Sequence, residues 1–550
     1  MRPLEVLLLL VTSVALVALF VPLPRTLRWV RHAPPAAAGM AIAQALAEGP
    51  RWQMIPAYAL ALAFVLIWLA RTVAPPGWRR GQTALPPMRA AVATGLGAMG
   101  LAIAVALPMA MPVFRFPPPD GPYAIGTLTY HWVDHSRSEV FAFGPSLRRQ
   151  LMVQIWYPAR ANPSASHGAY LPDADAVMAA FARIHGKPAL VFGHFKYVTT
   201  HAMPSASAAA DRPRYPVLLF LEGASGFRQM NTFQVEHLVS HGFIVVAIDQ
   251  PGAAATVVFP DGHQSAGLTL TQFHALVSPS YLPLGSNPSP PGDLPVNDTV
   301  RVDGSIIPYL TQDVIFTLDK LALLNQSDPQ GILTGRLDLQ RVGAFGVSLG
   351  GIVVGEACRL DARLRACLMM DAPMPANVVA AGLQPPSMWI TRDAASMRLE
   401  RQRSGGWSDA EIDAHQTSMR AVYERLPGAG YFVRVPGMFH GNFTDIPGWT
   451  PLATGLGIAG PLDRQRAHEI VNGYSSAFFE RHLMDRPGTL LDGPSPRYPE
   501  AMFESRRHGR NSPVLRVEPR FDPRVIAADR GAAAGAVPGI RRGRQHGKCA

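Results

Sequence analysis

A serine flanked by glycines is the feature of this chain that most directly indicates chemistry. Ser348 stands in the pattern Gly-x-Ser-x-Gly, between Gly346 and Gly350. The apolar run 341–347 before it is typical of a buried strand, and the run 351–357 after it is typical of the start of a helix. So tight a turn strains the serine backbone and lifts its hydroxyl above the sheet. The pattern predicts a nucleophilic serine; the alternative is a Gly/Ser turn in a loop.

A nucleophilic serine needs a base, and the base needs an acid that orients it. Asp371 ends the predicted strand 364–370, and His440 follows the predicted strand 431–437. The order Ser, Asp, His along the chain, with the acid and the base placed after strands, is that of the α/β-hydrolase fold. Asp393, at the end of a further apolar strand, is a rival for the acid, and we favour Asp371 from the residue pattern.

Acyl transfer also needs two backbone N–H donors for the oxygen that becomes negatively charged. The N–H of Leu349, directly after the serine, is expected to be one of them. The predicted strand 215–221 is followed by a loop that begins Glu222-Gly223-Ala224, and we assign the second donor to the N–H of Ala224. A glycine before that donor allows the backbone to approach a substrate closely.

A mostly parallel sheet flanked by helices is needed to bring these residues to one edge. Apolar strands alternate with helical stretches between residues 121 and 485, which is typical of the α/β class. The helical stretches are predicted at 233–240, 309–325, 351–359 and 464–483. This region is long enough to bury a sizeable core, and we assign it as the catalytic domain.

The same segments resemble the platelet-activating factor acetylhydrolase family, a branch of the α/β-hydrolases near the cutinase-like esterases. The resemblance is most specific in two loops, Met370-Asp371-Ala372-Pro373-Met374-Pro375 and His440-Gly441-Asn442-Phe443-Thr444-Asp445. The other matching segments are Gly121–Thr127, Gln154–Ala159, Tyr215–Phe220, Ser240–Ala247 and Gly346–Gly351. The resemblance implies a serine esterase with nucleophile Ser348, acid Asp371 and base His440, and with donors at Ala224 and Leu349.

The resemblance also implies a substrate, a short-acyl or oxidised phospholipid or a related lipid ester, and no metal or organic cofactor. Two positions depart from the family pattern: Val347 stands where a His is frequent, and Glu222-Gly223-Ala224 replaces a Ser-His-Gly motif. Val347 and Leu349 are expected to add apolar bulk beside the nucleophile, which favours short acyl chains. The alternatives are a cutinase-like esterase of broad specificity and a non-catalytic, membrane-bound interaction module.

The first 115 residues have the composition of a membrane segment. Three apolar stretches are long enough to cross a hydrocarbon core: Leu4–Leu23, Pro56–Val73 and Ala90–Val113. The stretch Pro34–Ala47 is shorter, so three and four transmembrane helices both remain open. A signal peptide is the alternative for the first stretch, but no clear small-residue cleavage site follows it.

The arginines of this segment predict its orientation. They concentrate in 25–31 and 71–89, whereas Arg51 alone lies in the turn between the middle stretches. The positive-inside rule places both arginine-rich loops in the cytoplasm and therefore the catalytic domain on the non-cytoplasmic side. A Pro-rich linker at 116–120 connects the membrane segment to that domain.

The net charge of +11 does not indicate a nucleic-acid partner, because much of it lies in those loops and in the tail. The tail, 497–550, is rich in Arg, Gly, Ala and Pro and is expected to be disordered, and the Ser/Pro/Gly-rich segment 285–295 is expected to be a loop. Cys358 and Cys367 are compatible with a disulfide and with two buried thiols.

The sequence predicts no metal site. His131 and His135 are four residues apart, as metal ligands on a helix often are. Their segment is predicted to be extended, however, and to open the catalytic domain.

Overall fold

The structure is a computed structural model of the 550-residue chain. It describes residues 1–21, 24–73, 87–141, 147–281, 305–507 and 510–511. The loop predicted at 285–295 and residues 512–550 of the predicted tail lie outside the described residues.

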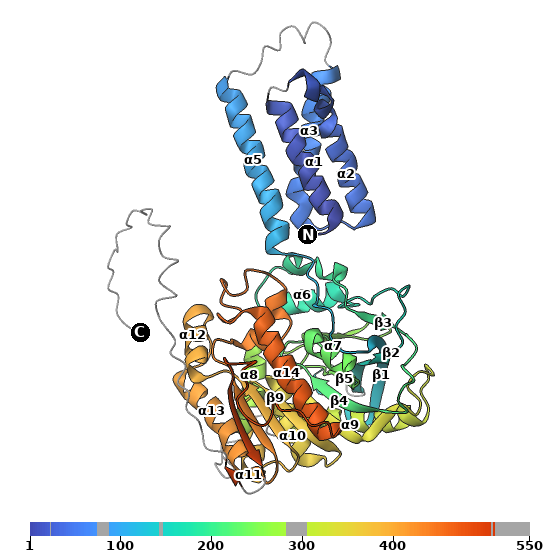
Figure 1. Cartoon of the computed structure of the whole chain (residues 1–550), viewed down its shortest axis with the longest axis vertical. Coiled ribbons are helices and arrows are strands. Elements are labelled where there is room, and N and C mark those ends of the chain that lie inside the picture. Colours follow the sequence, from blue (N-terminus) through green and yellow to red (C-terminus); the bar gives the residue numbers. More distant parts are fainter. Residues whose placement is uncertain (22–23, 74–86, 142–146, 282–304, 508–509, 512–550) are drawn as a thin grey trace, which may run out of the picture. The chain divides into compact units, whose positions relative to one another are not determined.

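An 11-stranded sheet forms the centre of the α/β domain among the described residues, in the order β13-β12-β11-β10-β9-β8-β4-β5-β2-β1-β3 (Figure 1). The strands from β5 to β11 in this order pair in parallel, and β1, β2 and β12 pair antiparallel at the two sides. The strand bounds are β1 Ala124–Ser138, β2 Arg148–Ala159, β3 Ala202–Pro204, β4 Tyr215–Leu221, β5 Ile244–Asp249, β8 Leu337–Val347, β9 Leu364–Met370, β10 Ser387–Thr391, β11 Gly430–Arg434, β12 Met502–Arg507 and β13 Arg510–Asn511. Strands β6 (Thr256–Val258) and β7 (Gln264–Ala266) pair in a separate ribbon.

The central strands are buried on both faces, which explains their continuous apolar sequences. Every residue of β4 is buried. Leu219 packs into one core cluster and its neighbours Leu218 and Phe220 into the other, because successive side chains of a strand point to opposite faces.

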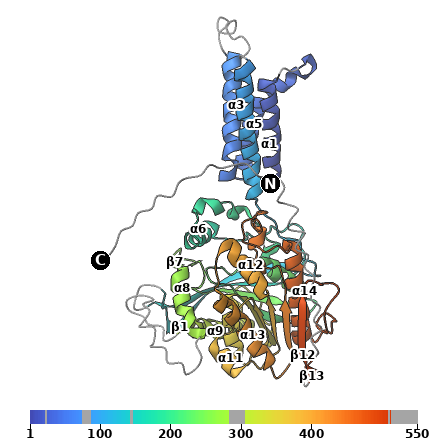
Figure 2. The same cartoon turned by 90° about the vertical axis from the view of Figure 1, so that its left-hand side faces the viewer.

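Helices cover both faces of the sheet (Figures 1 and 2). Residues of α9, α10 and α13 pack into the first core cluster, and residues of α7 and α14 pack into the second. The helices of this domain are α6 Ala174–Ile184, α7 Thr232–Ser240, α8 Leu270–Val277, α9 Ile306–Gln326, α10 Leu349–Leu360, α11 Ala376–Ala381, α12 Ala394–Ser404, α13 Asp409–Glu424 and α14 Arg464–Leu483. The predicted α/β-hydrolase architecture, a mostly parallel sheet between helices, is confirmed.

The domain extends further toward the C-terminus than the sequence predicts. Met502–Arg507, expected to belong to the disordered tail, forms β12 and pairs antiparallel with β11. Phe503 lies opposite Val433 and joins the second core cluster. Burial of this aromatic side chain stabilises the strand although most of the neighbouring residues are polar.

The sequence left the state of Cys358 and Cys367 open. In the structure a disulfide joins them, between α10 and β9.

The N-terminal segment is a helical bundle of α1 (Pro3–Phe20), α2 (Ala33–Ala47), α3 (Ile55–Val73) and α5 (Pro87–Ala110). Three helical stretches of the described residues are long and apolar enough to cross a membrane: Pro3–Phe20, Trp52–Val73 and Ala91–Ala110. Helix α2 has 15 residues and spans about 22 Å, less than the roughly 30 Å of a hydrocarbon core.

Polar contacts show how the bundle helices run. The carboxylate of Glu5, at the start of α1, pairs with Arg51, which lies between α2 and α3 and donates to the carbonyl of Met111 after α5. At the opposite end, Arg71 near the end of α3 donates to the carbonyl of Leu19 near the end of α1. Helices α1 and α3 therefore run in one direction, and α2 and α5 run in the other.

Candidate active site

Ser348 lies on a strained turn between β8 and α10. Its backbone has φ 55° and ψ −121°, and residues other than glycine rarely adopt a positive φ. A Cβ on Gly346 would lie 2.4 Å from the carbonyl carbon of Gly350, and one on Gly350 would lie 2.0 Å from the carbonyl oxygen of Leu221. The strained turn predicted from the pattern is confirmed, and the crowding explains why both flanking residues are glycines.

Asp371 and His440 come together although 69 residues separate them. Asp371 follows β9 and is buried, and His440 begins a short 3-10 turn after β11. The Nδ1 atom of His440 is 2.5 Å from Oδ2 of Asp371. The Ser348 hydroxyl makes no hydrogen bond to a described residue, and its contact with His440 stays a prediction.

The loop after β4 lies against the nucleophile. A Cβ on Gly223 would be 3.3 Å from Cβ of Ser348. The N–H of Ala224 bonds to no described residue, and Leu349 is the first residue of α10, so its N–H has no acceptor within the helix. The assignment of these two N–H groups as oxyanion donors stays a prediction.

The side chains of Val347 and Leu349 do not line an open pocket, contrary to expectation. Each is 1% exposed, and they pack into the two core clusters on opposite faces of the sheet. Val347 ends β8 and Leu349 begins α10, and these positions direct the two side chains into the cores.

Three side chains that the sequence did not single out hold the Asp371 carboxylate. Nε of Arg392 is 2.9 Å from Oδ2, the Thr391 hydroxyl donates to Oδ1 at 3.1 Å, and Nε2 of His415 is 3.5 Å from Oδ1. Burial alone would raise the pKa of Asp371, but the charge of Arg392, with the contacts of His415 and His440, holds that pKa well below its usual value. The carboxylate is therefore ionised while it contacts the imidazole.

Arg392 also connects the acid to the loop that carries the base. Besides Asp371 it pairs with Glu400 on α12, and Glu400 accepts the backbone N–H of His440 at 3.3 Å. Trp407 packs near both, with its ring centroid 5.9 Å from the Arg392 guanidinium and 6.4 Å from the His440 ring. In the sequence, these contacts are indicated only by the position of Arg392, which stands at a strand end beside the candidate acid Asp393.

Asp393, the rival for the acid, has a different role. It is the N-cap of α12, and its Oδ1 accepts the backbone N–H of Ser396 at 2.9 Å. Among the described residues, the structure places Asp371 and not Asp393 at His440.

The polar residues after His440 fix the shape of its loop. Oδ1 of Asn442 accepts the backbone N–H groups of Phe439 and Gly460, each at 2.8 Å. Asp445 accepts the N–H of Thr232 at 2.9 Å and so caps the N-terminus of α7. The polar residues of this motif thus form hydrogen bonds that fix the loop in which His440 stands.

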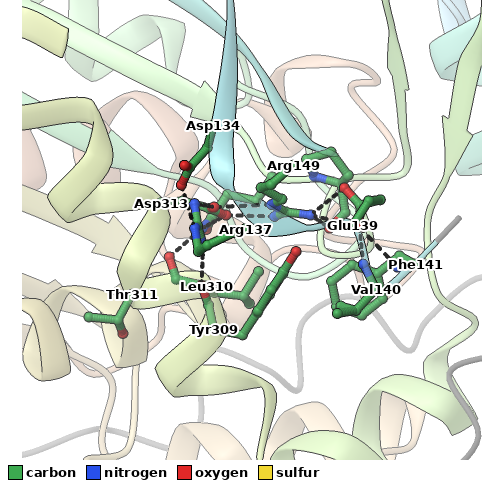
Figure 3. Close-up of polar contacts among 12 residues, drawn as sticks. Asp134, Arg137, Glu139, Val140, Phe141, Arg149, Tyr309, Leu310, Thr311 and Asp313 are labelled. Carbon is green, nitrogen blue, oxygen red and sulfur yellow. Dashed lines mark hydrogen bonds and ion pairs between the residues drawn. The ribbon is translucent and has the colours of Figure 1, made fainter. Parts of the chain in front are cut away.

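A buried ion network joins β1, β2 and α9 (Figure 3). Arg149 on β2 is fully buried and pairs with Glu139 at 3.0 Å and with Asp313 of α9 at 2.5 Å. Asp313 also pairs with Arg137 of β1 at 2.7 Å. Burial alone would raise the pKa of Asp313, but Arg149 and Arg137 lower it below the usual value.

This network reaches the loop that holds Ala224. The side-chain amide of Gln250 donates to Asp313 at 2.9 Å, and the backbone N–H of Gln250 donates to Glu222 at 3.3 Å. Glu222 is fully buried, and burial followed by repulsion from Asp249 raises its pKa well above the usual value. The loop is therefore held by contacts that come from β2, β5 and α9.

Comparison with known proteins agrees with this geometry. Residues 109–268 match the model of a family described as platelet-activating factor acetylhydrolase, isoform II. The chain is 24% identical over 431 residues to a probable 1-alkyl-2-acetylglycerophosphocholine esterase of Arthroderma benhamiae, covering 73% of this chain and 96% of that one. It is 20% identical to the platelet-activating factor acetylhydrolase of Gallus gallus, covering 70% and 88% of the two chains. The resemblance to platelet-activating factor acetylhydrolases is confirmed.

A solved structure supports the same class. A ferulic acid esterase from Streptomyces cinnamoneus superimposes with a TM-score of 0.53 at 27% identity, over 71% of this chain and 99% of that one. The acetylhydrolases and this esterase are all named for the hydrolysis of esters. The chain is therefore similar to ester hydrolases both in sequence and in fold.

Proposed function

We propose that this chain is a membrane-anchored serine hydrolase that cleaves short-acyl phospholipids or related lipid esters. The observation that carries the proposal is the 2.5 Å contact between His440 and Asp371 at the sheet edge where Ser348 occupies its strained turn. An intact order of nucleophile, acid and base on an α/β-hydrolase sheet is the arrangement that acyl transfer requires.

In the proposed mechanism, Ser348 attacks the ester carbonyl while Nε2 of His440 takes its proton. Asp371 accepts the Nδ1–H and stabilises the imidazolium that forms. The N–H groups of Ala224 and Leu349 hold the negative oxygen of the tetrahedral intermediate. The imidazolium returns the proton to the leaving alcohol, and water then clears the acyl-enzyme by the same steps. The scheme uses no metal or organic cofactor.

The substrate class rests on the relatives. The relative from Arthroderma benhamiae is named for an ester of acetate on a glycerophosphocholine, and this supports a short acyl chain on a phospholipid. We expect kcat/KM to be higher for acetyl and butyryl esters than for palmitoyl esters of the same alcohol. A preference for palmitoyl esters in that series would point to a true lipase.

A second candidate function follows from the solved structure. The ferulic acid esterase is more similar in sequence, 27%, than the relative from Arthroderma benhamiae, 24%. Its name points to esters of an aromatic acid, and this supports an esterase of broader specificity as the alternative. Methyl ferulate and an acetyl phospholipid, assayed on the same preparation, separate the two: the proposed function predicts faster turnover of the phospholipid.

A fluorophosphonate probe tests whether the site is catalytic at all. We expect the probe to label the full-length chain in detergent and to label Ser348→Ala not at all. His440→Ala should be labelled at least about 10³-fold more slowly, because the hydroxyl has lost its base. Equal labelling of the unchanged chain and Ser348→Ala would instead favour a non-catalytic interaction module.

We further propose that the bundle spans a membrane with the catalytic domain on the non-cytoplasmic side. The alternating helix directions bring the start of α1 and the end of α5 to one end of the bundle. Arg51 is buried and pairs with Glu5, and Arg2 at the same end pairs with Glu5 and Glu48, so neither arginine opposes the positive-inside rule. The disulfide between Cys358 and Cys367 also suits an oxidising compartment.

A reporter fusion tests this orientation. A fusion point after Arg80 should give cytoplasmic reporter activity, and a fusion point after Gly121 should give exported activity. A reporter active in the cytoplasm at the second point would overturn the orientation.

A further inference from the structure

Three side chains suited to metal binding meet at the C-terminal end of α7, and we call them the Asp120 cluster. His237 lies on the last turn of α7, His241 follows as its C-cap, and Asp120 comes from the segment before β1. Nδ1 of His237 is 2.8 Å from Oδ1 of Asp120, and Nε2 of His241 is 4.0 Å from the same oxygen. The three ligand atoms all lie within 4.8 Å of one another.

The hydrogen bonding of His241 identifies which of its ring nitrogens is free. Nδ1 of His241 is 2.8 Å from the carbonyl oxygen of His237. A carbonyl oxygen only accepts, so Nδ1 carries the proton, and Nε2 of the neutral ring presents a lone pair to the cluster. Histidines that bind metals commonly donate their other N–H to a backbone carbonyl in this way.

The Asp120 carboxylate also offers only lone pairs to this space. With Nδ1 as the donor, Nε2 of His241 and the Asp120 carboxylate face each other as two acceptors 4.0 Å apart, and a cation between them can accept both lone pairs. The side chain of His237 is 13% exposed and that of His241 is 24% exposed, so the cluster is open enough for an ion and its water to enter.

Backbone contacts hold Asp120 against the end of the helix. The N–H of Gly121 donates to the hydroxyl of Ser240 at 3.2 Å, and the N–H of Tyr123 donates to the Ser240 carbonyl at 3.1 Å. A Cβ on Gly121 would lie 2.2 Å from that carbonyl oxygen, so only glycine permits this close approach. The acid is thus brought to the two histidines by the backbone.

We propose that Asp120, His237 and His241 bind a divalent transition-metal ion of the zinc type, with water as the fourth ligand. Two imidazole nitrogens and one carboxylate oxygen are a ligand set that Zn²⁺ accepts. Tetrahedral bonds of about 2.0–2.1 Å place ligand atoms about 3.3–3.4 Å apart, and the distances of 2.8 and 4.0 Å lie on either side of this value.

The position of the cluster indicates a structural role for the ion. The N-terminus of α7 receives Asp445 from the His440 loop, whereas the cluster lies at the opposite end of this helix. A metal there fastens the segment that follows Pro117–Pro119 to the catalytic domain, away from the nucleophile. The inference is independent of the proposed hydrolysis.

Metal binding to the full-length chain in detergent tests the proposal. After removal of metal by a chelator, we expect one Zn²⁺ to bind per chain and to raise the Tm by a few degrees. His241→Ala should weaken Zn²⁺ binding at least about tenfold and remove the Tm shift. His263→Ala is the matched control, because His263 pairs with Asp261 on the surface with no third ligand among the described residues, and it should bind Zn²⁺ as the unchanged chain does.

Two further measurements keep the proposal decidable. Asp120→Asn retains the shape of the side chain and should also weaken Zn²⁺ binding, and circular dichroism shows whether each variant is folded. Co²⁺ in place of Zn²⁺ should give the visible absorption of a four-coordinate site. If the unchanged chain and His241→Ala bind Zn²⁺ equally, or if neither binds it, the cluster is a hydrogen-bonded Asp–His pair and the proposal is wrong.

Discussion

Two buried aspartate–arginine pairs in this domain have nearly the same construction. Asp371 pairs with Arg392 and Asp313 pairs with Arg149, and all four side chains are 0% exposed. In both pairs, burial alone would raise the pKa of the aspartate, and the arginine charge lowers it below its usual value. The electrostatics of the pair alone therefore do not distinguish an active site from a structural network.

The remaining partners of each aspartate distinguish the two pairs. Asp313 is surrounded by donors that keep their protons, the guanidinium of Arg137 and the amide of Gln250. Asp371 contacts His440, whose side chain is 32% exposed and whose imidazole can act both as a proton acceptor and as a proton donor. A buried pair thus becomes part of a proposed catalytic group when one partner is a partly exposed imidazole.

The largest expected effect is on catalysis and separates the two aspartates. Asp371→Asn should reduce kcat by about 10⁴-fold, because the imidazole loses the acceptor that sets its tautomer and stabilises its charge. Asp313→Asn, measured at a temperature where the variant is folded, should change kcat by less than about tenfold. Ester hydrolysis by both purified variants checks this, and similar losses of kcat would remove the distinction.

The next effect is on stability. Arg149→Met leaves Asp313 and Glu139 buried without their shared partner and should lower the free energy of unfolding by about 3–5 kcal/mol. Arg137→Met should cost less, because the Arg137 side chain is 16% exposed and water can replace part of its contacts. Urea unfolding of the three proteins gives the comparison, and a larger loss for Arg137→Met would contradict the assigned roles.

The pH dependence of stability tests the lowered pKa values. An aspartate whose pKa is lower in the folded state stabilises the fold above its unfolded pKa of about 4, and this stabilisation is lost as the pH falls through the folded pKa. The free energy of unfolding should therefore fall as the pH drops below about 4. Asp313→Asn should be less stable at pH 7 and should lose less of its remaining stability between pH 5 and pH 3. A parallel loss in both proteins would show that Asp313 does not contribute.

The smallest expected effect concerns Asp393, the rival acid. Asp393→Ala removes the N-cap of α12 and should lower the free energy of unfolding by about 1 kcal/mol. Its kcat should stay within about threefold of the unchanged chain, because Asp393 does not contact His440. A loss of kcat comparable to that of Asp371→Asn would overturn the assignment of the acid.

Features that depend on neighbouring residues could be predicted from the sequence. Strand Tyr215–Leu221, strand Leu364–Met370 and helix Arg464–Leu483 have the bounds that apolar periodicity predicted. The strained turn at Ser348 was predictable because Gly346 and Gly350 stand two residues before and two residues after the serine. Each of these features follows from neighbouring residues, whose spacing sets the backbone conformation and the buried face.

Contacts between side chains that are distant in the sequence depend on the tertiary structure and could not be predicted from the sequence alone. Arg392, Glu400 and His415 come from three different elements, and their contacts around Asp371 depend on the strand order and register of the sheet. The same holds for the cores that bury Val347 and Leu349. The energy of a buried charge depends on the partners that surround it in space, and separation along the chain carries little information about them.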